Sequence, residues 1–183
     1  MAGRGIGKNS RKIALCGLMT ALGAALMLLG GLFPIATYVV PLAAGVLLLP
    51  ARSEYGTGTA LVQWLATCLI VLALGVDREA AFFYVFLGYY PAIKPKLDAL
   101  SPLVVRLAVK LALFAAATAA MYAFLYFVLQ LSAIIEQMAE TGFIMGALFF
   151  VMLIACMLIY DAALAAMDSL YRRRVRPKLK FLN

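Results

Sequence analysis

The sequence contains no histidine, and only 13% of its 183 residues are charged. Without histidine, the chain lacks the side chain that most often ligates metals and acts as a general base near neutral pH. A soluble domain is about half apolar and about a quarter charged, whereas this chain is 66% hydrophobic. The composition therefore predicts an all-α integral membrane protein, a bundle of transmembrane helices with short loops.

Cysteine is also scarce. Cys16, Cys68 and Cys156 all lie in apolar stretches, and no CxxC pair occurs. We expect them to be packing residues, with no disulfide framework and no zinc site. The sequence also lacks HExxH, GxSxG and P-loop motifs, so we predict no enzyme, no metal, no cofactor and no ATP hydrolysis by the chain itself.

The stretch over residues 11–31 organises the rest of the chain. Two basic residues, Arg11 and Lys12, precede about twenty apolar ones, which is enough to cross a bilayer as a helix. Because this run exceeds the usual 7–15 residues of a signal-peptide core, we expect it to be retained. Gly17, Ala21 and Ala25 recur every four residues and so share one helical face, on which another helix can pack closely.

Apolar runs and proline positions predict six membrane-spanning helices. Proline and glycine are expected to end most of them, and Pro41 either kinks the second helix or marks its start. We expect a polar turn over residues 51–58, a polar amphipathic connector over residues 94–102, a flexible basic tail before the first helix and a strongly basic tail after the last. The predicted helices cover residues 13–29, 35–49, 59–74, 80–93, 103–131 and 142–171, and the tails cover residues 1–12 and 172–183.

The distribution of basic residues supports this count. The net charge is +8, and fifteen of the sixteen lysines and arginines fall on one side of the predicted membrane. The exception is Arg78, which lies between Asp77 and Glu79. Because cytoplasmic loops are enriched in Lys and Arg, we expect a plasma-membrane protein with both termini in the cytoplasm. The positive charge is expected to meet anionic lipid rather than nucleic acid.

Two clusters of charged residues are candidate sites. Asp161 lies deep in the last helix, at a depth comparable to Arg106 and Lys110 in the preceding one. These three residues form either a structural cluster of ion pairs within the membrane or a proton-coupled site. Asp77 and Glu79 flank the outer turn, which is either a plain exposed loop or part of a ligand site lined by nearby aromatic rings.

Six short-looped helices, basic cytoplasmic ends and the AxxxA pattern from Ala21 to Ala25 resemble the substrate-binding S component of energy-coupling factor (ECF) importers. The resemblance implies a protein that captures a vitamin-like micronutrient from outside. It also implies docking through Gly17, Ala21 and Ala25 to a transmembrane scaffold subunit that carries two ATPases. The implied ligand residues, near the outer helix ends, are Asp77, Glu79, Tyr84 and Tyr122.

Two other hypotheses remain open. The chain could be a non-enzymatic membrane scaffold resembling the MreD-type subunits of cell-shape complexes, which would use the same small-residue faces to recruit partners. It could also be a small proton-coupled carrier, in which Asp161 would take up the proton. Tight binding of a small molecule and co-purification of ATPases distinguish the S component from both.

Overall fold

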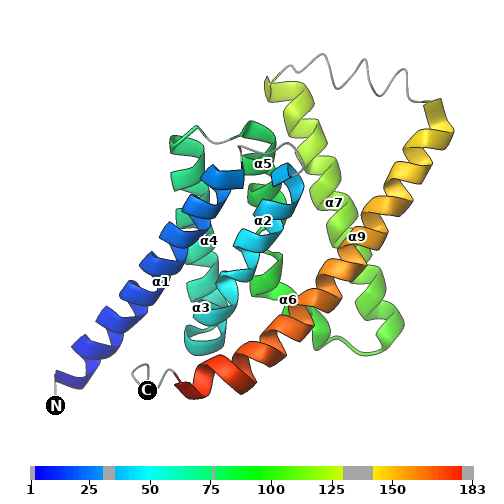
Figure 1. The fold of residues 1–183 in the computed structure, drawn as a ribbon. Coiled ribbons are helices and arrows are strands. Elements are labelled where there is room, and N and C mark those ends of the chain that lie inside the picture. The colour runs from blue at the N-terminus through cyan, green and yellow to red at the C-terminus, as the bar shows by residue number, and fades with distance from the viewer. Residues whose placement is uncertain (1–2, 31–35, 76, 130–141, 179–183) are drawn as a thin grey trace. The chain divides into compact units, whose positions relative to one another are not determined.

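The computed structural model describes residues 3–30, 36–75, 77–129 and 142–178, which form a succession of helices (Figure 1). A single π-helical turn and a short 3₁₀ turn follow the last of them. The α-helices are α1 Gly3–Gly30, α2 Ala36–Val46, α3 Leu48–Tyr55, α4 Thr57–Ala73, α5 Arg78–Leu87, α6 Tyr90–Asp98, α7 Leu103–Leu129 and α9 Gly142–Leu170; the final turns are η1 Tyr171–Val175 and η2 Arg176–Lys178.

The described segments contain no β-strand, so the prediction of an all-helical chain is confirmed for them. Three stretches are long and apolar enough to cross a membrane: Asn9–Gly30, Leu103–Met121 and Ile154–Arg174. The helix α4, with 17 residues, is apolar but shorter. These lengths and compositions are those of a membrane protein.

The chain divides into two compact units. The first comprises Met1–Lys96 and Leu164–Asn183, and the second comprises Leu97–Ala163. In the first unit α1 packs against α2 and α4, and these three helices lie side by side (Figure 1). Its core is made of small and medium apolar side chains with one buried phenol: Ala24, Met27, Ala44, Cys68, Val71, Ala80, Ala81 and Tyr84.

Prolines interrupt two of the predicted helices, but not where the sequence indicated. Helix α2 ends at Val46 and α5 ends at Leu87, four residues before Pro50 and Pro91 respectively. A proline ring clashes with the carbonyl of residue i−4 and cannot donate to it, whereas proline is tolerated in the first turn of a helix. The helix therefore breaks upstream, and each proline lies in the first turn of the next helix. Pro41, in contrast, lies inside a continuous α2.

Two side chains of α4 donate to backbone carbonyls next to these breaks. Gln63 Nε2 donates to the carbonyl of Leu47 at 3.2 Å. The indole Nε1 of Trp64 donates to the carbonyl of Tyr84 at 3.2 Å, and this carbonyl also accepts from the amide of Gly88 at 2.8 Å. These two neighbouring side chains therefore attach α4 to both interrupted segments.

Several predicted turns and tails are helical instead. Residues 51–55 belong to α3, so only Gly56 separates it from α4, with a φ of 87° that favours glycine. Residues 94–98 belong to α6, and α1 begins at Gly3 rather than after a flexible tail. Once a helix has formed, each added residue gains a backbone hydrogen bond at little further cost, and this gain outweighs the poor helix propensity of Gly5 and Gly7 in α1. The predicted boundaries at residues 35 and 131, and residues 179–183 of the tail, lie outside the described residues.

Candidate functional site

The small-residue stripe of α1 lies on the exposed face of this helix. Gly17, Ala21 and Ala25 are all exposed, and a Cβ added at Gly17 would meet no atom within 4 Å. The adjoining face, with Ala24 and Met27, is buried in the core of the first unit, and Ala24 lies about 60° around the helix from Ala21. Thus the described contacts of α1 leave the stripe uncovered, and a helix could approach it closely.

In the second unit, one lysine holds two carboxylates. The Nζ atom of Lys110, in α7, lies 2.5 Å from Asp98 Oδ1 and 2.9 Å from Asp161 Oδ2. The lysine side chain is only 7% exposed, whereas those of Asp98 and Asp161 are 36% and 22% exposed. Lys110 therefore bridges the two carboxylates, an arrangement that fits a structural ion-pair cluster.

Arg106 lies one turn before Lys110 but takes no part in this ion-pair cluster. Its side chain lines a cavity of about 250 Å³, together with Lys110, Asp161 and apolar side chains of α7 and α9. Among the described residues, the Arg106 guanidinium makes neither a hydrogen bond nor an ion pair. The expected trio therefore gathers around one cavity, with Lys110 joined to Asp161 and with Arg106 apart.

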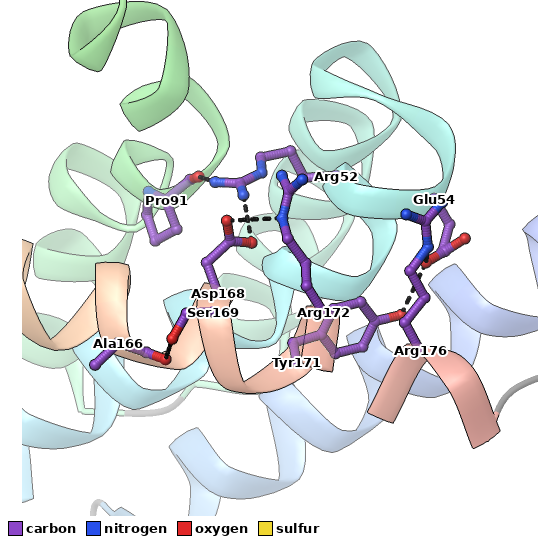
Figure 2. A network of polar contacts seen from close by, with 9 residues as sticks. All are labelled: Arg52, Glu54, Pro91, Ala166, Asp168, Ser169, Tyr171, Arg172 and Arg176. Carbon is purple, nitrogen blue, oxygen red and sulfur yellow. Dashed lines mark hydrogen bonds and ion pairs between the residues drawn. The ribbon is translucent and has the colours of Figure 1, made fainter. Parts of the chain in front are cut away.

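A second polar network joins the C-terminal end of α9 to α3 in the first unit (Figure 2). Arg52, whose side chain is 5% exposed, lies 2.6 Å from Asp168 and also donates to the carbonyl of Pro91 at 3.0 Å. In a regular helix this carbonyl would accept from the N–H of the residue four positions later. That residue is Pro95, which has no N–H. Arg52 therefore supplies the missing donor. The exposed Arg172 completes the set, 3.1 Å from the other oxygen of Asp168.

The same network continues through Glu54, whose side chain is 8% exposed. Arg176 lies 3.1 Å from its carboxylate, and the hydroxyl of Tyr171 donates to it at 3.4 Å. Both partners come from the π-helical and 3₁₀ turns that follow α9 (Figure 2). The first residues of the predicted basic tail are therefore attached to α3.

The N-terminal end of α5 holds two of the proposed ligand residues in structural contacts. Asp77 caps α5 by accepting from the amide of Glu79 at 3.1 Å, and it accepts from the hydroxyl of Thr37 at 3.0 Å. Glu79 accepts from the hydroxyl of Tyr38 at 3.4 Å. These bonds tie the N-terminal end of α5 to that of α2.

The two proposed tyrosines lie apart from this end of α5. Tyr84 is 1% exposed and packs in the core of the first unit, so its phenol is not accessible to a ligand. Tyr122 lies in α7, in the other unit, and its side chain lies outside the described residues. The structure therefore brings Asp77 and Glu79 together but adds neither tyrosine to them.

Sequence reasoning missed Asp98 and the pairing of Arg52 with Asp168. Asp98 was assigned to a polar connector, and no periodicity relates it to Lys110 because helices α6 and α7 are separated by residues 99–102. Arg52 and Asp168 are 116 positions apart, which leaves no local signal.

The chain matches no protein-family model, no curated protein and no solved structure.

Proposed function

We propose that this chain is the membrane-embedded, substrate-binding S component of an ECF-type importer. It would capture a vitamin-like micronutrient from outside and dock through α1 to a transmembrane scaffold that carries two ATPases. The observation that carries the proposal is the exposed stripe of Gly17, Ala21 and Ala25. A stripe needed for packing within the chain would be buried, as Ala24 and Met27 are.

The proposal includes six membrane crossings with both termini in the cytoplasm. Four crossings are α1, α4, α7 and α9, and the other two are interrupted helices. Together α2, Leu47 and α3 cover 20 residues, from Ala36 to Tyr55, which corresponds to about 30 Å and matches a bilayer core. The α5–α6 pair reaches a similar length, from Arg78 to Asp98.

The ligand would enter at the outer turn that contains Asp77 and Glu79. Both carboxylates are partly exposed, and Phe83 and Tyr38 form an edge-to-face pair beside them, with ring centroids 5.7 Å apart. Carboxylates next to aromatic edges suit a small polar or cationic ligand. Because Tyr84 is buried, the proposal no longer includes it.

The test replaces the small residues of the stripe with tryptophan in the full-length tagged protein. Ala21→Trp and Ala25→Trp should abolish co-purification of ATPase subunits from native membranes while leaving a bound small molecule detectable by native mass spectrometry. The matched control is Leu22→Trp, because Leu22 is 52% exposed but lies about 100° around the helix from Ala21. Ala24→Trp should instead unfold the protein, because Ala24 is buried.

Other outcomes favour the other hypotheses. If the wild type carries no small molecule and co-purifies with cell-wall proteins, the MreD-like scaffold is correct and the importer proposal fails. For the proton-coupled carrier, Asp161→Asn should abolish pH-dependent uptake in cells that lack the ATPases. Asp161 lies 2.9 Å from Lys110 Nζ, so a structural ion pair accounts for this carboxylate without a carrier role.

A further inference from the structure

The charges beside Arg106 are paired unevenly. Asp98 and Asp161 both contact Lys110, so two negative charges meet one positive charge there, and Arg106 brings the sum of the four charges to zero. Arg106 lines the same cavity, is only partly exposed, and makes no hydrogen bond or ion pair within the described part of the chain. A guanidinium offers five N–H donors in a planar fork that matches a phosphate. The charged group of the cavity whose donors lack a direct partner is therefore a cation, and its geometry fits an anion.

The position of Arg106 along α7 indicates the depth of that anion. The apolar stretch of α7 begins at Leu103, so Arg106 lies about 5 Å along the helix axis from the end of the span. This depth corresponds to the boundary between headgroups and acyl chains, whichever side of the membrane α7 starts from. A soluble anion would have to leave water to reach it, whereas a lipid headgroup is already there.

The apolar wall of the cavity continues from Arg106 towards the middle of the span. Leu107, Leu111 and Phe114 follow at spacings that keep them on one face of α7, and Leu158 of α9 lies opposite them. From Arg106 to Phe114 the wall covers about 12 Å along the axis. An acyl chain that descends from a headgroup at Arg106 would lie along this wall.

The size of the cavity also favours a ligand that is only partly enclosed. It measures about 250 Å³, below the roughly 300–1,000 Å³ of sites that surround a small molecule. A lipid needs only its headgroup and part of one chain held by the protein, and the rest stays in the bilayer.

We propose that this cavity between α7 and α9 binds one anionic phospholipid, with its phosphate on Arg106 and one acyl chain along Leu107, Leu111 and Phe114. The site depends on α7 being embedded in the membrane and is independent of the proposed importer function. Lys110 and Asp161 form its floor and already contact each other, so Arg106 provides the donors that bind the headgroup.

The test measures lipid retention by native mass spectrometry of the full-length protein, with phosphatidylglycerol and phosphatidylcholine of the same acyl chains as probes. We expect the wild type to retain one phosphatidylglycerol about tenfold more tightly than phosphatidylcholine. Arg106→Gln should remove this preference, and Leu111→Trp should weaken binding of both lipids by filling the wall. The matched control is Arg173→Gln, since Arg173 is an exposed arginine outside the cavity, and it should change retention less than twofold.

Glycerol 3-phosphate and inorganic phosphate form the soluble arm of the test. If either displaces the bound phosphatidylglycerol at equal concentration, the cavity is a site for soluble anions and the proposal is overturned. Equal loss in the Arg106→Gln and Arg173→Gln variants would overturn it as well, because binding would then be general attraction to basic residues. Should Leu111→Trp fail to fold, Arg106→Lys serves in its place: it keeps the charge, loses the planar fork, and should retain only part of the preference.

Discussion

Lys110 makes two ion pairs within the second unit. It is nearly buried and lies between Asp98 and Asp161, so each carboxylate depends on the same ammonium group. Removal of one partner from a buried ion pair costs more than the pair contributes, because the remaining charge loses its compensation. The position should therefore tolerate substitution poorly.

We predict that Lys110→Met lowers the free energy of unfolding by roughly 2 kcal/mol, because the two carboxylates keep partial access to water. The measurement is thermal unfolding in a neutral detergent, followed by circular dichroism. Arg106→Met is the control one helical turn away, and it should change the stability by less than about 0.5 kcal/mol. Equal destabilisation by both substitutions would mean that the contact with Asp98 and Asp161 carries no net stability.

At the scale of the helix, α1 has two faces with opposite tolerance for added volume. Gly17 belongs to the exposed stripe and has open space around it. Gly30, at the other end of the helix, is buried against Val40 of α2, and an added Cβ would lie 2.6–2.8 Å from three atoms of that rigid side chain. The same glycine-to-alanine change should therefore give opposite results at the two positions.

We predict that Gly30→Ala lowers stability by about 2 kcal/mol, because a branched side chain at close range cannot move aside. Gly17→Ala should leave stability unchanged or raise it by up to about 1 kcal/mol, since alanine favours a helix more than glycine does. Comparison of the two unfolding midpoints in the same detergent checks the prediction. A loss of stability with Gly17→Ala would show that the stripe is covered from within the chain.

The helices also show what the sequence could predict. The extents of α7 and α9 agree with the predicted helices to within two residues where they are described, because long apolar runs have clear ends. The breaks before Pro50 and Pro91 were misplaced, since the constraint of a proline acts on the carbonyl four residues upstream as well as on the preceding residue. The contributions of Gln63 and Trp64 at these breaks are tertiary, and no local pattern marks them.

At the scale of the whole molecule, the sequence indicated a membrane protein more securely than any site. Composition decides this property, and it does not depend on side-chain geometry. The candidate site was predicted in part: Lys110 and Asp161 do lie together, whereas Asp98 and the Arg52–Asp168 contact join residues from separate helices. Such pairings depend on how helices pack, which the spacing of residues along the chain does not encode.

The proposed topology makes a prediction for the entire chain. In a background without the three native cysteines, we expect Ser10→Cys, Ser101→Cys and Arg173→Cys to be protected from a membrane-impermeant thiol reagent in intact cells. These cysteines should react only after the cells are permeabilised, because they would face the cytoplasm. A cysteine at Arg78 should react in intact cells. Labelling of Ser101→Cys from outside would mean that the α5–α6 pair does not cross the membrane, and the six-crossing topology would be wrong.

The guanidinium of Arg52 compensates for a defect that another residue creates. Pro95 cannot donate to the carbonyl of Pro91, and Arg52 does so from α3. Arg52 and Pro95 therefore depend on each other although no hydrogen bond joins them. Pro95→Ala should act as a partial suppressor of Arg52→Met, reducing its cost by about 1 kcal/mol in a double-mutant cycle, because the new amide restores the missing donor. Among descendants of this chain, loss of the proline would relax selection on an arginine 43 positions away.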